Sequence, residues 1–246
     1  MLILLPPSEG KATSEEGHPL ALETLTLPEL NPARQEVMEE LVDVCSGPED
    51  TAREVLGLSA SQTEEIKSNL SLTSSPALRA DNLYTGVLYD RLGLADLPHT
   101  ERVLIFSALW GVVSPDDRIP PYRLSMGRKL PPLGGLGAYW RRAAKNVLDE
   151  FTEGHLLVDC RSSACAAAFK SPSALSVRVL RERVVDGERR RSVVSHMAKA
   201  TRGDIARSLL RENVNAATPA QLADALRDLG HTVELSERSL DVVVQD

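Results

Sequence analysis

The chain opens with MLILLPPSEGKA at residues 1–12, four apolar residues that run into two prolines and then a serine, a glycine and a lysine. The apolar run 2–5 has the length and composition of a buried strand, and the prolines end it because proline cannot donate to a sheet ladder. A phosphate loop of the P-loop type would need more glycines, and a Ser or Thr after the lysine. The stretch therefore predicts a first strand whose end carries Ser8 and Lys11.

Two later apolar runs, 102–107 and 155–160, predict further strands of the same kind. The segments between them have apolar residues three to four apart and helix-start residues, which predict helices at 32–45, 59–70 and 137–151. This alternation predicts an α/β fold with a mixed sheet. Because no linker or repeat interrupts it, we expect one compact domain over 1–246, with a helical insertion near 30–95.

The last third of the chain has a different pattern. Two alternating runs joined by Asp186-Gly187 predict a β-hairpin over about 175–197. A helix over about 200–212 and a second one over 218–230, capped by Thr218 and ended by Gly230, are expected to follow. The segments 231–235 and 240–245 predict a closing pair of strands.

Composition places the chain among ordinary globular proteins, with 246 residues of which 42% are hydrophobic and 26% charged. It has no apolar run near the roughly 18 residues that span a bilayer, and its start does not resemble a secretory signal. Its three cysteines make no disulfide framework. We therefore expect a cytoplasmic protein that does not bind membranes.

Charge is distributed unevenly along the chain. Residues 1–101 hold 6 basic and 18 acidic side chains, a net charge of −12. Residues 118–145 hold 7 basic side chains and no acid, and residues 178–213 hold 10 basic and 5 acidic ones, a net charge of +5. Two basic segments in an acidic chain indicate a basic cleft for an anionic ligand, whereas solvated surface faces are the alternative reading.

Polar residues follow each expected strand, at the edge where open α/β sheets bind ligands. Ser8 and Lys11 follow the first strand, Ser107 ends the second, and Asp159 ends the third. A carboxylate that ends an apolar strand needs a partner or a function, so Asp159, Lys11 and His196 are the candidate catalytic residues. Serines in such places can also be simple helix caps.

The stretch IPPYRLSMGRKL at 119–130 carries an aromatic hydroxyl and several cations without an acid. The planar fork of Arg123 suits phosphate or carboxylate, and Tyr122 could stack on a ligand or hydrogen-bond to it. The alternative is a proline-stiffened loop in which Tyr122 and Met126 pack in the core. Histidines and cysteines show no metal-ligand spacing, so neither a metal site nor a cofactor is expected.

Taken in order, MLILLPPSEGKA, LYTGVLYD, PYRLSMG and AKATRG resemble the YaaA family of peroxide-stress proteins over nearly the whole chain. The resemblance implies protection against oxidative stress by limiting free iron, with DNA binding as a proposed activity. It also implies a helix-hairpin-helix-like element, which falls at 52–70 here, where Glu64 and Glu65 make the segment acidic. The expected cleft comprises Ser8, Lys11, Tyr122, Arg123, Lys170, Lys199 and Arg202.

Two functions remain open from the sequence. One is a stress protein that binds double-stranded DNA through the basic cleft, and the other is an enzyme acting on a nucleotide, a nucleobase or a related small anion there. Lysine, arginine, tyrosine and aspartate together at strand ends favour the enzyme, because a DNA-binding surface does not need a buried carboxylate. Direct iron binding is disfavoured, since the residues that would ligate iron are not clustered in the sequence.

Overall fold

The computed structural model describes residues 1–185, 188–193 and 196–245, although the side chains of 184–189, 193 and 196 lie outside the description. Its main sheet has the strand order β11-β12-β9-β8-β1-β3-β4, with β10 paired to β9. These strands are β1 (Leu2–Leu5), β3 (Val103–Ser107), β4 (Gly111–Val113), β8 (Leu157–Asp159), β9 (Ala174–Val185), β10 (Glu188–Val193), β11 (Val233–Leu235) and β12 (Ser239–Gln245).

The centre of the sheet is parallel, as short buried apolar runs predict. β1 pairs in parallel with β3 on one side and β8 on the other, so that Ile3 lies opposite both Val103 and Val158. β8 continues in parallel to β9, and β9 to β12, whereas β4, β10 and β11 pair antiparallel at the margins. The expected mixed α/β sheet is confirmed. The ends of β8, β1 and β3 consequently meet at one edge.

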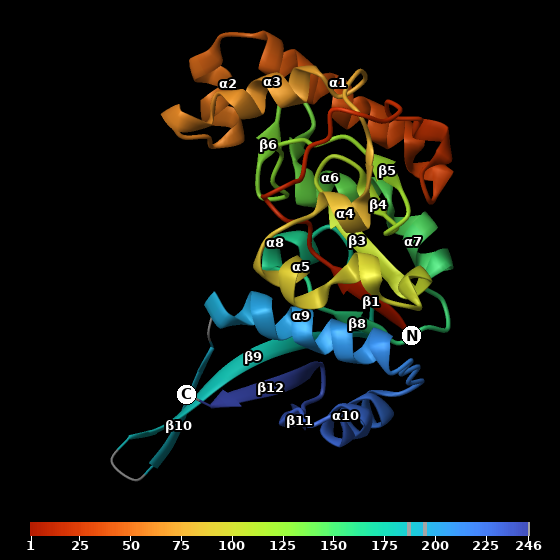
Figure 1. The fold of residues 1–246 in the computed structure, drawn as a ribbon, viewed down its shortest axis with the longest axis vertical. Coiled ribbons are helices and arrows are strands. Elements are labelled where there is room, and N and C mark those ends of the chain that lie inside the picture. Colours follow the sequence, from red (N-terminus) through yellow and green to blue (C-terminus); the bar gives the residue numbers. More distant parts are fainter. Residues whose placement is uncertain (186–187, 194–195, 246) are drawn as a thin grey trace.

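Helices lie on both sides of this sheet and at one end of the molecule (Figure 1). α1, α2 and α3 gather at the end opposite the projecting β9–β10 hairpin, and α9 packs against α5 and β9. The helices are α1 (Asn31–Ser46), α2 (Glu49–Leu56), α3 (Glu64–Leu70), α4 (Ala80–Leu83), α5 (Val87–Leu92), α6 (Leu136–Ala143), α7 (Lys145–Phe151), α8 (Ser163–Ala166), α9 (His196–Arg211) and α10 (Pro219–Asp228).

Short elements complete the fold. The two-stranded pairs are β2 (Leu78–Arg79) with β5 (Arg118–Ile119), and β6 (Lys129–Leu130) with β7 (Gly134–Gly135). The 3-10 turns are η1 (Leu22–Thr24), η2 (Pro28–Leu30), η3 (Ala60–Gln62), η4 (Leu94–Asp96) and η5 (Thr100–Arg102). No described helix is both long and apolar enough to cross a membrane.

Three helix predictions need correction. The helix expected at 137–151 is two helices, α6 and α7, which meet at Ala144. The Trp140 indole of α6 donates to the Ala108 carbonyl at 2.8 Å, and Leu148 of α7 is buried. The helix expected at 59–70 starts with the η3 turn, because Ser59 and Gln62 form a capping box there. The helix expected near 200 begins at His196.

Other predictions from the last third hold. β9 and β10 form the expected hairpin, although its turn at 186–187 lies outside the described residues. Thr218 caps α10 by accepting from Gln221, and β11 pairs with β12. The single domain over 1–246 remains a prediction.

Helix α1, which lies in the segment predicted to be an insertion near 30–95, is held to the sheet by the fully buried Arg34. Arg34 donates to the main-chain oxygens of Trp110 at 3.0 Å and Val112 at 2.7 Å, and also to Thr26, Leu27 and Asn31. These acceptors satisfy a charge that would otherwise be costly to bury, and burial lowers the pKa of Arg34 to about 10. α1 is thereby fixed next to β4.

Candidate functional site

The site lies at the edge where β8, β1 and β3 end. Because these strands are parallel neighbours, Ser8, Ser107 and Asp159 come to the same edge of the sheet. The main chain then pairs residues 10–12 with 83–85: Lys11 forms an isolated antiparallel bridge to Tyr84, and the Ala12 N–H donates to Leu83 O at 2.8 Å. This pairing places the side chain of Lys11 beside the rings of Tyr84 and Tyr122.

Lys11 is the central cation of the site. Its ammonium Nζ donates to Ser8 O at 2.9 Å and lies 4.1 Å from the ring centroid of Tyr122 and 5.7 Å from that of Tyr84. Burial, and secondarily the charge of Arg123, lowers the pKa of Lys11 to about 7. Its amine is therefore poised to gain or lose a proton near neutral pH.

Two phenols and a serine adjoin this lysine. The hydroxyl of Tyr122 lies 3.0 Å from that of Tyr84 and 2.7 Å from Ser107 Oγ, and all three residues are buried. Burial raises the pKa of Tyr122 to about 12 and raises that of Tyr84 well above its usual value. Tyr122 and Met126 are both core residues, so the packing role considered for 119–130 holds, while Tyr122 still contacts Lys11.

Arg123 is positioned through its main chain. Its N–H donates to Asn69 Oδ1 at 2.8 Å, and its carbonyl accepts from Asn69 Nδ2 at 2.9 Å. Its guanidinium, 16% exposed, forms an ion pair with the exposed Glu9 at 3.2 Å. The cation therefore sits at the rim of the site, where a stronger anion could replace Glu9.

Asp159 is held by a partner two residues away. Arg161 donates to it from the main chain at 3.0 Å, from Nε at 2.8 Å and from Nη2 at 2.8 Å, and the guanidinium lies 4.0 Å from the ring centroid of Phe106. Both oxygens of the carboxylate are thus occupied. This arrangement gives Asp159 a structural reason for its position, and its catalytic role remains a prediction.

The other expected cleft residues are not drawn into one site by the described contacts. Ser8 accepts from the Thr85 N–H at 3.1 Å and donates to Gly10 O, so it shapes the loop. Arg202 donates from Nε to Val177 O at 3.1 Å, beside β9. Lys170 and Lys199 are exposed, and the side chain of His196 lies outside the described part of the chain.

Tyr84, Ser107 and Asn69 complete the site. Ser107 lies at the edge where the sequence places it, whereas Tyr84 and Asn69 had no predicted role. Tyr84 could have been noticed, since it lies in the LYTGVLYD motif. Nothing local marks Asn69, which reaches Arg123 across 54 positions of sequence.

The segment 52–70 contains most of α2 and all of α3, joined by a turn, and the main-chain N–H groups of that turn donate to acceptors within the same segment. Gly57 N–H donates to Glu54 O at 3.2 Å, Leu58 N–H to Arg53 O at 2.8 Å, and Ser59 N–H to Gln62 Oε1 at 3.0 Å. A phosphate would need such amides to be free. The internal hydrogen bonds therefore provide no support for phosphate binding at this turn.

The cysteines and potential metal ligands add no further site. Cys45, Cys160 and Cys165 are free thiols in the interior, and burial raises the pKa of each. Within the described residues, no group of three His, Cys, Asp or Glu side chains could hold a metal ion.

Fold and site together define a mixed α/β protein in which a half-buried lysine packs on two buried phenols at the carboxyl edge of the sheet. A family model described as peroxide stress protein YaaA matches residues 1–235. A UPF0246 protein of Streptomyces coelicolor is 48% identical, covering 100% of this chain and 99% of that protein. A UPF0246 protein of Corynebacterium efficiens is 40% identical, with 96% of each covered. The chain belongs to the YaaA family of peroxide stress proteins.

Proposed function

We propose that this chain serves the peroxide-stress response as an enzyme that acts on a small anion, such as a nucleotide or nucleobase, at Lys11. The observation that carries the proposal is a half-buried lysine with a near-neutral pKa, placed over the ring of Tyr122 and next to Arg123. The guanidinium would bind the anionic group, and the amine would exchange a proton with the ligand. The iron-limiting role of the family would then be a downstream effect of this reaction.

Thermal-shift and calorimetric binding assays with nucleotides, nucleobases, orthophosphate and carboxylates test the proposal. We expect one class to bind with micromolar to millimolar affinity. We also expect Lys11→Met to bind at least tenfold more weakly, since a buried charge-assisted contact contributes about 1.5–3 kcal/mol. Lys199→Met is the matched control, because Lys199 is exposed on α9. Equal binding by both variants would contradict the assignment of the site.

Cells without the gene extend this test to the stress role. Expression of the natural chain should restore peroxide resistance and a low chelatable iron pool. Lys11→Met should restore neither, while Lys199→Met should restore both. Full rescue by Lys11→Met at equal protein level would separate the stress role from this site.

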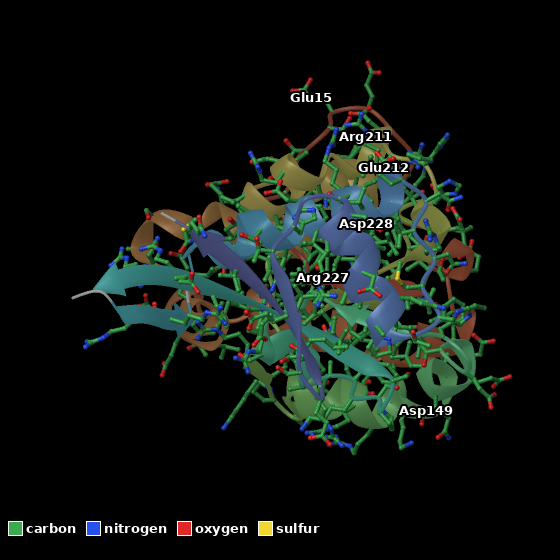
Figure 2. The ribbon with its side chains drawn as sticks, turned by 90° about the horizontal axis from the view of Figure 1, so that it is seen from below. Glu15, Asp149, Arg211, Glu212, Arg227 and Asp228 are labelled. Atoms are coloured by element: carbon green, nitrogen blue, oxygen red, sulfur yellow. The ribbon has the colours of Figure 1, made fainter. Side chains whose placement is uncertain are left out.

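DNA binding is a second candidate, favoured by exposed cations for which the described residues form no ion pair, namely Arg118, Lys129, Arg141, Arg142, Lys170, Lys199 and Arg238. Several other surface arginines are matched by acids. Arg211 of α9 pairs with Glu212, and Arg227 of α10 pairs with Asp224; the side chains of Arg211, Glu212 and Arg227 are labelled in Figure 2. A broad surface of one sign is therefore less well supported than the local site.

Fluorescence anisotropy of a labelled duplex over a salt series distinguishes the two candidates. A DNA-binding surface predicts a log–log slope of about −0.9 for each phosphate neutralised, and weaker binding by Lys199→Met than by Lys11→Met. If the chain is an enzyme, Lys11→Met should bind a small anion more weakly than Lys199→Met does, and the natural chain should bind little duplex at physiological salt.

A further inference from the structure

Three buried hydroxyls form a connected chain beside Lys11. Ser107 Oγ lies 2.7 Å from Tyr122 Oη, which lies 3.0 Å from Tyr84 Oη. Ser107 is fully buried, and each tyrosine is 2% exposed. A hydroxyl has one proton to donate and two lone pairs to accept with, so the direction of each hydrogen bond can be worked out from the neighbours.

In the hydrogen bond between Ser107 and Tyr122, Ser107 must be the donor. Its oxygen accepts from the main-chain N–H of Leu109 at 3.2 Å and of Trp110 at 2.9 Å, which occupies both lone pairs. The contact between the phenols consumes a second proton. Three hydroxyls hold three protons, so one phenolic O–H is left without an acceptor among the described residues.

The other two tyrosines of the chain do not share this surplus. Tyr89 donates to Pro6 O at 2.8 Å, and Tyr139 donates to Glu36 Oε2. All four tyrosines are therefore accounted for, and only the Tyr84–Tyr122 pair has a proton to spare. Buried hydroxyls without an acceptor are rare in folded proteins, which points to an acceptor from outside the chain.

Tyr122 is the better placed of the two phenols. The Lys11 ammonium lies nearer its ring than that of Tyr84, and Arg123 follows it directly in the chain. If Tyr84 donates to Tyr122, the Tyr122 oxygen accepts two hydroxyl protons and its own O–H is the spare one. Accepting two hydrogen bonds polarises the Tyr122 O–H and makes it a stronger donor, while burial keeps the pKa of the phenol at about 12, so that it stays protonated.

We propose that Tyr122 donates its O–H to an anionic or carbonyl oxygen of the ligand that binds at Lys11, and that Ser107 and Tyr84 are positioning residues that fix this proton. The inference rests on the proposed function and narrows the ligand class. The ligand is a small anion whose acceptor oxygen lies between the phenol and the amine, while its charge faces Arg123. A purely apolar or cationic molecule would leave the proton unpaired.

Carbon-13 NMR of protein labelled at the tyrosine ring carbon that bears the hydroxyl tests this directly, because the chain gives only four such resonances. Phe substitutions of Tyr84, Tyr89 and Tyr139 assign three of them, and the fourth is that of Tyr122. The probes are orthophosphate, pyruvate and 5′-AMP. We expect at least one to shift the Tyr122 resonance saturably by more than about 1 ppm, with Tyr139 unchanged as the internal control.

Binding by variants separates the donor from its positioning residues. Tyr122→Phe should weaken the probe at least tenfold and Tyr84→Phe no more than about threefold. In Ser107→Ala the shift of the Tyr122 resonance should shrink, because the proton order is no longer fixed. Should Tyr122→Phe fold poorly, since it leaves two buried hydroxyls unpaired, the titration of the natural chain still decides the matter.

The outcomes distinguish this inference from the proposed function. If no probe binds the natural chain at millimolar concentration, the proposed function fails and the inference with it. If a probe binds in a manner abolished by Arg123→Ala, but the Tyr122 resonance stays fixed and Tyr122→Phe binds equally well, only the inference is overturned. A shift confined to Tyr84 would also overturn it, because Tyr84 would then be the donor.

Discussion

Residues 6–12 and the turn at 56–60 both place a glycine among polar residues at the end of a regular element, and either could bind an anion on sequence grounds. In the turn, the main-chain donors of Gly57, Leu58 and Ser59 are all consumed within the same helical unit. In the strand-end loop, the main chain pairs with 83–85, and the Lys11 side chain reaches Tyr122.

The difference lies in where the donors find acceptors. A capped turn satisfies its amides within a few residues, so its glycine serves the backbone conformation, with φ at +65° for Gly57. A strand that ends at two prolines leaves side chains to find partners far along the chain. Spare hydrogen-bonding capacity therefore marks the candidate site better than glycine does, and the following predictions test that contrast.

The largest effect is expected at the buried ion pair beside the site. Asp159→Asn leaves the Arg161 guanidinium, whose side chain is 1% exposed, without its counter-charge. We expect a loss of about 3–5 kcal/mol in the free energy of unfolding, measured in urea. Asp224→Asn, which breaks an exposed pair with Arg227, is the matched control and should change little. Unchanged stability with lost ligand binding would instead make Asp159 part of the site's chemistry.

A smaller effect is expected where the two regions meet. Asn69, in α3, holds both main-chain polar groups of Arg123. Asn69→Ala should cost about 2–3 kcal/mol, because it leaves two buried groups unpaired, and should also weaken anion binding at Arg123. Calorimetry and chemical unfolding measure the two effects. Asn82→Ala, at an exposed position, is the control. If both variants lost the same free energy of unfolding, the hydrogen bonds between Asn69 and Arg123 would contribute nothing to stability.

The pH dependence of stability tests the state of Lys11. Its pKa of about 7 lies below the ordinary value of 10.5, so between these pH values the unfolded chain binds the proton and the folded chain does not. Stability from this group should therefore rise with pH, by at most about 1.4 kcal/mol per unit. Lys11→Met should abolish that rise, whereas the exposed Lys67→Met should keep it. A flat profile of the natural chain from pH 7 to 10 would contradict the lowered pKa.

The smallest effect is expected at the turn. Gly57→Ala forces a side chain into the left-handed region and toward the Arg128 guanidinium, which can move aside. We expect a loss of about 1–2 kcal/mol and unchanged anion binding. Gly154 has a similar positive φ, but a Cβ added there would meet no atom within 4 Å. The difference in free energy of unfolding between Gly57→Ala and Gly154→Ala therefore measures the cost of displacing Arg128. Weaker DNA or anion binding by Gly57→Ala alone would restore the turn as a binding element.

The centre of the fold could be predicted because short apolar runs and parallel pairing are local and additive signals. LILL at 2–5, the run at 102–107 and the run at 155–160 are adjacent strands, and the residues after them share an edge. The grouping of Ser8 and Lys11 with Ser107 followed from that rule alone.

Partner choice could not be predicted, because it depends on contacts across the chain. Nothing in the sequence says that Asp159 pairs with Arg161 instead of a ligand, or that Arg34 is buried under main-chain oxygens. The break at Ala144 was also missed, because the helical pattern of 137–151 runs through that position without an interruption in the sequence.

The pairing of residues 10–12 with 83–85 also bears on how this protein can vary. After β1 the chain runs to Ala12 and comes back beside it at Leu83, and the Ala12 N–H donates to the Leu83 carbonyl at 2.8 Å. Segment 13–82 is thus closed at its base, and the cost of closing such a loop grows only slowly with its length. Homologues or engineered versions could lengthen, shorten or replace surface parts of this segment that lie away from Arg34 and Asn69, while Lys11 and Tyr84 keep their registration.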